Sequence, residues 1–213
     1  MQAEAPRAPS PTPKGADKMD GENKKITSAQ TPVDKTEVTL SSDCVYDAGF
    51  IRVMSDRVRL PSGKESGRCY VKHPGGVCVA AIDAEGSVAF VRQYRYAMSQ
   101  EVLELPAGKI DEGESPEDCG RRELLEETGM TAEKFIPLGV MYPTPGYSNE
   151  GIYMFLAENA IHGQAKPDED EFLDTVMMPF DKALYQSLTG AINDAKTVIC
   201  LARADLRRRR GKQ

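Results

Sequence analysis

The chain has 213 residues, a net charge of −6 at pH 7 and 28% charged residues, an ordinary balance for a globular protein. Its acidic character gives no attraction to nucleic acid or to an anionic membrane surface. No apolar run reaches the roughly 18 residues that would cross a bilayer, and the start of the chain lacks the apolar centre of a secretory signal. The cysteines have no paired spacing, so we expect reduced thiols and a cytoplasmic location; they are Cys44, Cys69, Cys78, Cys119 and Cys200.

Residues 1–34 are predicted to be a disordered tail. Prolines recur at positions 6, 9, 11 and 13, and almost no aromatic or branched residues follow them. The pattern then becomes β-type, because "GFIRVMSDRVRL" and "GRCYVKH" flank a turn that contains Pro61 and Gly63. We therefore expect an N-terminal antiparallel β segment over 35–74, a main domain over 75–206 and a basic tail over 207–213.

The main domain opens with two apolar runs, "GVCVAAID" and "SVAFVRQ", whose tight connection through Gly86 predicts a hairpin. The first run is apolar on both faces, as a central strand covered on both sides would be. A helix is predicted from about Pro116 to Thr128, with Ser115 as N-cap and Gly129 as a left-handed stop. Further strands are expected near "KFIPLGVMY", "GIYMFLA" and "EFLDTVMMP".

Two helices are predicted to close the chain, one opening at Asp181 and one near Asn193. In the last helix, residues at helical spacing form one apolar stripe that we expect to face the core: Ala195, Val198, Ile199, Ala202 and Leu206. Strands and helices are mixed without regular βαβ alternation, so the predicted fold class is α+β with a mixed sheet.

The helix over 116–128 carries three carboxylates, Glu123, Glu126 and Glu127, within an arc of roughly 100°. The like charges of Glu123 and Glu127, four residues apart, destabilise the helix by about 0.2–0.5 kcal/mol. A solvated acidic face is the commoner reason for such a cluster. However, the preceding loop, "LPAGKIDEGES", can turn sharply and bring a backbone carbonyl nearby. Clustered carboxylates become favourable when they share a hard cation such as Mg²⁺, so this region predicts a metal site.

The same stretch resembles the Nudix box, the signature of the Nudix hydrolases. The matching positions are Gly108, Glu114, Arg122, Glu123, Leu124, Glu126, Glu127, Gly129 and Met130. The resemblance implies an α/β/α sandwich and hydrolysis of a nucleoside diphosphate linked to another moiety. It also implies Mg²⁺ as the cofactor, with Mn²⁺ as a substitute.

The resemblance further assigns roles to individual residues. Glu123 and Glu127 would bind the metal together with the carbonyl of Ala107. Arg122 would hold the carboxylates in position, a role that suits its planar guanidinium. Glu126 would be a further ligand or an acid/base participant.

Three features outside the box resemble the ADP-ribose pyrophosphatase subfamily. "RQYRY" precedes the box, and its Arg95 would contact substrate, as would Gly108 within the box. "YPTPGYSNE" places Pro145 sixteen residues after Gly129 and ends at Glu150, which would face substrate. The acidic loop "KPDEDEF" supplies a candidate general base and a candidate additional metal ligand, Glu169 and Glu171. Whether Glu126 or Glu169 is the general base stays open.

The resemblance also implies a homodimer that exchanges N-terminal strands, with Arg68 reaching the substrate. The subfamily often has Glu next to this arginine, whereas this chain has Cys69. The expected reaction is hydrolysis of ADP-ribose to AMP and ribose 5-phosphate. The alternatives are GDP-mannose or ADP-glucose as substrate, or a non-catalytic protein that senses ADP-ribose. His73 and His162 have no metal-ligand companion in the sequence, so we expect structural or solvent-facing roles for them.

Overall fold

The structure is a computed structural model that describes residues 34–165 and 172–210. The predicted tail therefore lies outside the described residues, except for its last position. Among the described residues, the chain forms two sheets, three α-helices and one short 3₁₀-helix, η1 (Tyr96–Met98). These elements belong to one unit that begins at Thr36. No described helix is long and apolar enough to cross a membrane.

The first sheet is the N-terminal antiparallel β segment that the sequence predicts. Its strands are β1 (Val38–Asp47), β2 (Arg52–Arg59) and β3 (Glu65–Lys72), in that spatial order. The connection between β2 and β3 turns at Gly63, whose φ of 82° suits glycine. The middle strand pairs with both neighbours along its whole length.

The second sheet is mixed. Its strands follow the spatial order β6-β5-β4-β8-β7, and β9 pairs with β5. β4 and β8 are parallel, whereas the other pairs are antiparallel. The strand bounds are β4 (Gly76–Asp83), β5 (Ser87–Arg95), β6 (Gln100–Glu104), β7 (Lys134–Met141), β8 (Ile152–Ala160) and β9 (Leu173–Pro179).

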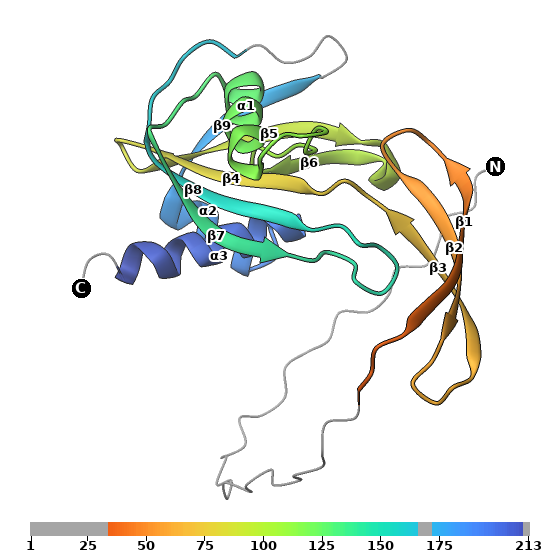
Figure 1. The fold of residues 1–213 in the computed structure, drawn as a ribbon. Helices are drawn as coiled ribbons and strands as arrows, with labels where there is room; N and C mark the ends of the chain where they lie inside the picture. Colours follow the sequence, from red (N-terminus) through yellow and green to blue (C-terminus); the bar gives the residue numbers. More distant parts are fainter. Residues whose placement is uncertain (1–33, 166–171, 211–213) are drawn as a thin grey trace, which may run out of the picture. The chain divides into compact units, whose positions relative to one another are not determined.

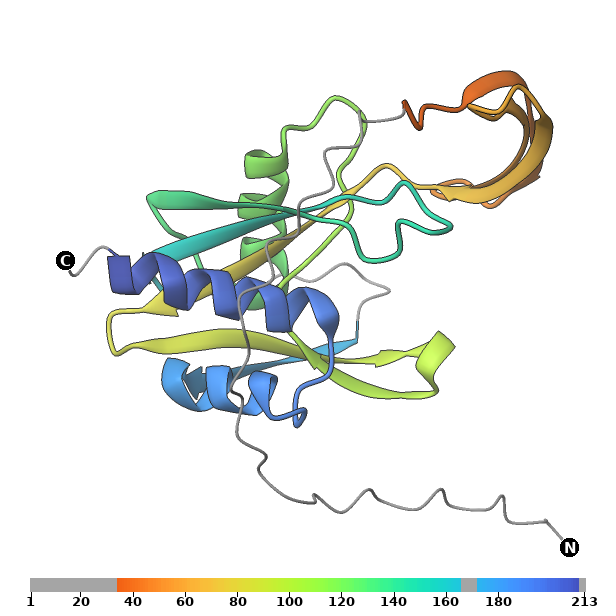
Figure 2. The same cartoon turned by 90° about the horizontal axis from the view of Figure 1, so that it is seen from below.

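Helices cover both faces of this sheet (Figures 1 and 2). On one face, Val77 and Val79 of β4 pack with Leu124 of α1 (Pro116–Thr128). On the other face, Cys78 and Ala80 pack with the two C-terminal helices, α2 (Phe180–Leu188) and α3 (Ala195–Arg210). Every residue of β4 is buried, because alternate side chains enter different cores. The predicted α/β/α sandwich with a mixed sheet is confirmed.

The hairpin predicted between β4 and β5 is only partly correct. Gly86 makes the expected tight turn, but Ile82 and Val88 are the one pair of residues that joins the two strands. β5 then pairs with β9 and β6 instead. The loop after β6 takes the place beside β4, where Val79 and Val77 donate to the carbonyls of Pro106 and Gly108, both at 2.9 Å. This divergence brings the Gly108 loop into the middle of the sheet.

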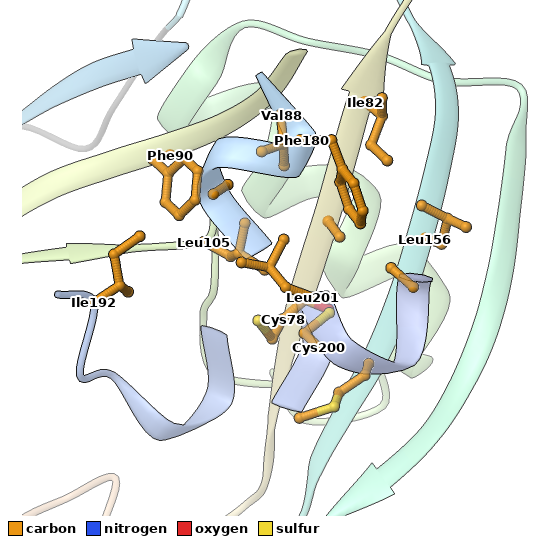
Figure 3. Close-up of a cluster of buried hydrophobic side chains, with 14 of the residues drawn as sticks. Cys78, Ile82, Val88, Phe90, Leu105, Leu156, Phe180, Ile192, Cys200 and Leu201 are labelled. Atoms are coloured by element: carbon orange, nitrogen blue, oxygen red, sulfur yellow. The ribbon is translucent and has the colours of Figure 1, made fainter. Parts of the chain in front are cut away.

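The closing helices form where the sequence predicts them, but the predicted apolar stripe of α3 is wrong. Ala195 and Leu206 are exposed, and the buried stripe is displaced by two positions along the helix, which places it on nearly the opposite face: Thr197, Cys200, Leu201 and Ala204. An apolar pattern misses Thr197, whose hydroxyl accepts a hydrogen bond from the Leu105 amide at 2.8 Å. Figure 3 shows Cys200 and Leu201 packed in this core with Cys78 and Phe180.

Candidate functional site

Helix α1 begins and ends where local chemistry dictates. The Ser115 hydroxyl accepts a hydrogen bond from the Asp118 amide at 3.1 Å, the usual N-cap arrangement, and Pro116 occupies the first turn. Gly129 ends the helix with a φ of 70° and donates to the Leu125 carbonyl at 2.8 Å. These two signals fix the rotation and length of the helix, and therefore which face its glutamates present.

Arg122 holds three carboxylates together. Its guanidinium donates to both oxygens of Glu114 at 2.9 and 3.0 Å, to Glu123 at 2.8 Å and to Glu126 at 3.0 Å. The hydrogen bonds from Arg122 lower the pKa of Glu114 to about 2. The spacing that resembles the Nudix box therefore builds a fork of carboxylates around one cation, which offsets the repulsion between them.

Glu123 and Glu127 face inward rather than into solvent, with only 8% and 2% of their surfaces exposed. The Ala107 amide donates to Glu127 Oε2 at 3.0 Å. Because the carbonyls of Pro106 and Gly108 bond to β4, Ala107 presents its own polar groups to the opposite side, as alternation along an extended chain requires. Two buried carboxylates and one backbone segment thus converge.

Gly108 makes this convergence sterically feasible. A Cβ at this position would lie 1.8 Å from Glu123 Oε1, far inside van der Waals contact. The backbone here does not need a positive φ, so the requirement for glycine comes from the close approach of the carboxylate.

A pocket of about 500 Å³ opens over these groups. Its walls come from both sheets and their connections, the loop before α1 and the start of α3. The ionisable residues among its lining are His73, Arg95, Lys109, Glu123, Glu127, Glu150, Asp194 and Lys196. The volume lies within the range of small-ligand sites. Mixed charges beside two buried carboxylates suit an anionic ligand that arrives with divalent cations.

One wall of the pocket is a buried ion network. Both Arg95 and Lys196 donate to Glu104, which is 1% exposed, and Arg95 does so with Nε at 2.5 Å and Nη2 at 2.8 Å. Burial alone would raise the pKa of Glu104, but the two cations hold that pKa below its ordinary value. Asp194 accepts a further hydrogen bond from Lys196 at 3.0 Å.

Another part of the pocket lining is aromatic. His73 packs edge-on against Phe50, with ring centroids 6.2 Å apart, and the Lys109 ammonium lies 4.5 Å from the Phe50 ring centre. Glu150 approaches His73 Nδ1 at 3.7 Å. The prediction that His73 is structural or solvent-facing thus misses that it lines the pocket.

The structure brings some of the remaining predicted residues to this pocket and not others. Glu150 and Arg95 line it, whereas Pro145 is exposed and its neighbour Pro143 contributes to the wall instead. Arg68 lies in β3, pairs with Glu37 at 2.8 Å and is not among the described lining residues. Its contact with substrate stays a prediction. Glu169 and Glu171 lie outside the described residues.

A divalent cation fits the described donors. No group of three or more His, Cys, Asp and Glu side chains in 34–165 and 172–210 is arranged to hold a metal ion. Glu126, the third glutamate, bonds to Arg122. The two buried carboxylates and the Ala107 backbone nevertheless supply hard oxygen ligands around the space that Gly108 leaves beside Glu123. A cation such as Mg²⁺ commonly completes such a set with waters and substrate oxygens.

Sequence reasoning missed Asp194 and Lys196, which line the pocket. Asp194 carries a recognisable signal, because an Asp three residues before Thr197 is a helix N-cap pattern. Lys196 has none, since a lysine in a first helical turn normally points into solvent. Only the hydrogen bonds between the start of α3 and the end of β6 in the folded chain reveal its contact with Glu104.

Comparison with known proteins places this geometry in context. Residues 72–200 match the family model described as the NUDIX domain. Two relatives, the ADP-ribose pyrophosphatase of Bacillus subtilis and the methanol dehydrogenase activator of Bacillus methanolicus, are each 36% identical over 78% of this chain and 90% of the relative. A GDP-mannose pyrophosphatase of Shigella flexneri is 37% identical over 54% of this chain and 64% of the relative. The crystal structure of an ADP compounds hydrolase superposes with a TM-score of 0.70 at 21% identity, covering 83% of this chain and 95% of that one; this likeness concerns the fold.

Proposed function

The chain belongs to the Nudix family, and on this premise we propose that it hydrolyses the diphosphate of ADP-ribose or of a closely related nucleoside diphosphate sugar. The observation that carries the proposal is the convergence of Glu123, Glu127 and Ala107 in one pocket, with Arg122 behind them. The complete set of box glutamates favours an enzyme over a protein that only senses the nucleotide.

Glu123, Glu127 and the Ala107 carbonyl would hold Mg²⁺, with Glu171 as an additional ligand. The bound cation supplies charge neutralisation for the diphosphate and lowers the pKa of a water. Arg122 fixes the carboxylates in place, since a planar guanidinium can engage several oxygens at once. Arg95 binds a phosphate oxygen from the other wall of the pocket.

A carboxylate must also take the proton of the attacking water. Glu126 is one candidate, because it is partly exposed, directly precedes Glu127 and lies about one helical turn after Glu123. Glu169 is the other candidate. Arg122 donates to Glu126 Oε2 at 3.0 Å and so fixes the orientation of this carboxylate.

ADP-ribose is the preferred substrate on the present observations. The Bacillus subtilis relative named for this activity aligns with more of the chain than the GDP-mannose pyrophosphatase does. The aromatic pair Phe50 and His73 at one end of the pocket would receive a base, and the charged wall at Arg95 would face the diphosphate and sugar. GDP-mannose is the second candidate, supported by the Shigella flexneri relative. A panel of ADP-ribose, ADP-glucose and GDP-mannose with Mg²⁺ separates them by relative kcat/KM.

The proposal extends to a homodimer in the cytoplasm, formed through residues 35–74. All of β1 is exposed, and it presents large apolar side chains that a second copy would cover: Val38, Leu40, Val45 and Tyr46. An exposed apolar strand of this kind is unusual in an isolated chain. Light scattering of the purified protein should give twice the mass of one chain, and a monomer would contradict this part of the proposal.

Glu127→Gln tests whether the site is catalytic. The amide keeps the shape of the side chain but removes the charge that the cation requires. We expect kcat with ADP-ribose and Mg²⁺ to fall by about a thousandfold, the scale seen for groups that stabilise a transition state. ADP-ribose affinity measured in EDTA should change less than about threefold.

Glu133→Gln is the matched control, because Glu133 is an exposed glutamate outside the pocket. It should retain full activity. Wild-type protein that releases no AMP from ADP-ribose, or a Glu127→Gln variant that turns over normally, would overturn the proposed function.

A further inference from the structure

We propose that Lys196 is a positioning residue that holds Arg95 in its working orientation through the buried carboxylate of Glu104. This inference deepens the proposed function and rests on it, because Arg95 is the residue assigned to a phosphate oxygen. Lys196 comes from α3, Glu104 from β6 and Arg95 from β5. Three separate elements therefore meet at one carboxylate in the wall of the pocket.

Glu104 is shared between the two cations in a fixed way. Arg95 uses Nε and Nη2 to grip both oxygens, and Lys196 donates to Oε2 as well. This grip leaves Nη1 as the guanidinium group for an anion in the pocket that Arg95 lines. A bidentate pair fixes the plane of the guanidinium, so the carboxylate sets the direction of Nη1.

The burial of Glu104 explains why one cation is not enough. The Glu104 side chain is 2% exposed and Lys196 is 13% exposed, whereas Arg95 is 43% exposed and in contact with the pocket. A carboxylate that has lost its water needs charged partners for the lone pairs on both oxygens. Without Lys196, Arg95 would be the one remaining cation bonded to Glu104 among the described residues. The Arg95 guanidinium would then be drawn toward the buried carboxylate and away from a ligand.

The first turn of α3 keeps Lys196 itself in place. Asp194 Oδ2 accepts from the Thr197 amide at 3.0 Å and from its hydroxyl at 2.6 Å, while Asp194 Oδ1 accepts from Lys196. The Thr197 hydroxyl in turn accepts from the Leu105 amide, the residue next to Glu104. The helix start and the strand end are thus joined at two adjacent points, one charged and one neutral.

Lys196→Met tests the positioning role. Methionine fills a similar volume without the charge. We expect KM for ADP-ribose to rise about tenfold with kcat within about threefold of wild type, because an interaction made equally in the ground and transition states affects binding alone. Lys196→Arg restores a cation and should recover most of the affinity. Lys182→Met, an exposed lysine of α2, is the matched control and should behave as wild type.

A double-mutant cycle with Glu104→Gln separates positioning from direct contact. If Lys196 acts through Glu104, the tenfold effect of Lys196→Met should shrink to less than about twofold in the Glu104→Gln background. An undiminished effect in that background would show that Lys196 touches substrate itself, and would overturn the inference.

Thermal unfolding of the same four proteins gives a readout that needs no substrate. Lys196→Met should lower the midpoint by about 5 °C in the wild-type background, since it leaves a buried carboxylate short of one partner. In the Glu104→Gln background, Lys196→Met should lower the midpoint much less. If wild type is inactive on ADP-ribose but this coupling appears, only the proposed function fails. Normal activity with additive midpoint shifts would refute the coupling instead.

Discussion

Arg122 explains how a short helix tolerates three neighbouring glutamates. Its guanidinium bonds to Glu114, Glu123 and Glu126, so the repulsion expected from sequence spacing is offset before any metal binds. Two of the three helix glutamates, Glu123 and Glu127, can therefore be buried rather than solvated. The residue pattern is therefore a means of pointing carboxylates inward, toward the Ala107 backbone.

Gly108→Ala should damage the site without damaging the fold. The added methyl would overlap the Glu123 carboxylate, whose nearest oxygen would be 1.8 Å away. The carboxylate must move, because the Gly108 backbone is bonded to β4. We expect ADP-ribose hydrolysis with Mg²⁺ to fall at least about tenfold, since small misplacements of catalytic groups are costly.

Gly67→Ala is the control for this change, because a Cβ there has no neighbour within 4 Å and the backbone has no positive φ. It should keep activity. Circular dichroism should report both variants as folded. A fully active Gly108→Ala enzyme would mean that Glu123 is not held where the structure places it.

Single residues were predictable where local sequence decides their position. Arg122 and its glutamates follow from spacing within one helix and its loop. Lys196 and Phe50 were not, because each reaches the pocket through packing between elements distant in sequence. The contact of Arg68 with substrate, which the resemblance implies, stays a prediction; in the described chain its guanidinium is paired with Glu37.

At the scale of elements, α1 was predictable to the residue because its ends carry their own chemistry. The start of α3 was also signalled, but the face of α3 was not. Cys200 and Thr197 face the core, whereas Ala195 and Leu206 are exposed. Tertiary contacts with Leu105 and β4 outweigh the apolar pattern here. The split between β4 and β5 likewise depends on which strands β5 meets, and no local signal encodes that choice.

Ser115→Ala should weaken α1 through the loss of its cap. The Ser115 hydroxyl accepts from the Asp118 amide, and alanine leaves that amide without this acceptor. We expect about 1 kcal/mol of destabilisation, which lowers the thermal midpoint of a chain of this size by about 2–4 °C. Ser41→Ala on exposed β1 should shift the midpoint by less than about 1 °C. Equal midpoints for the two variants would argue against the capping role.

At the scale of the whole molecule, the pocket forms where strands β4 and β5 of the mixed sheet separate, between the two helical layers. β4 and β5 separate after one pair of residues, and the Leu105–Gly108 segment fills the gap from β6. α1 then supplies carboxylates from one face, and the start of α3 supplies Lys196 and the preceding Asp194 from the other. The site thus depends on all three layers, which is why the global stability of the fold and the charge state of its carboxylates are linked.

Acid titration of unfolding tests that link. Hydrogen bonds from Arg122 lower the pKa of Glu114 to about 2, and the pKa values of Glu104 and Asp83 are also lowered, although burial opposes the shift. For Glu114 the pKa is near 4.5 in the unfolded chain and about 2 in the folded chain. At a pH between these two values, the unfolded chain binds more protons than the folded chain. Stability should therefore be complete above about pH 5 and decline as the pH falls toward 2. Urea midpoints at pH 7, 5, 4 and 3 measure this decline.

Arg122→Gln should flatten the same titration. Without the guanidinium, the folded pKa of Glu114 moves back toward 4.5, so the variant is less stable at pH 7 but loses less between pH 5 and pH 3. Arg59→Gln, an exposed arginine at the end of β2, should reproduce the wild-type curve at a similar change in net charge. A wild-type slope that persists in Arg122→Gln would assign the acid sensitivity to Glu104 and Asp83, and would remove Arg122 as the centre of the carboxylate cluster.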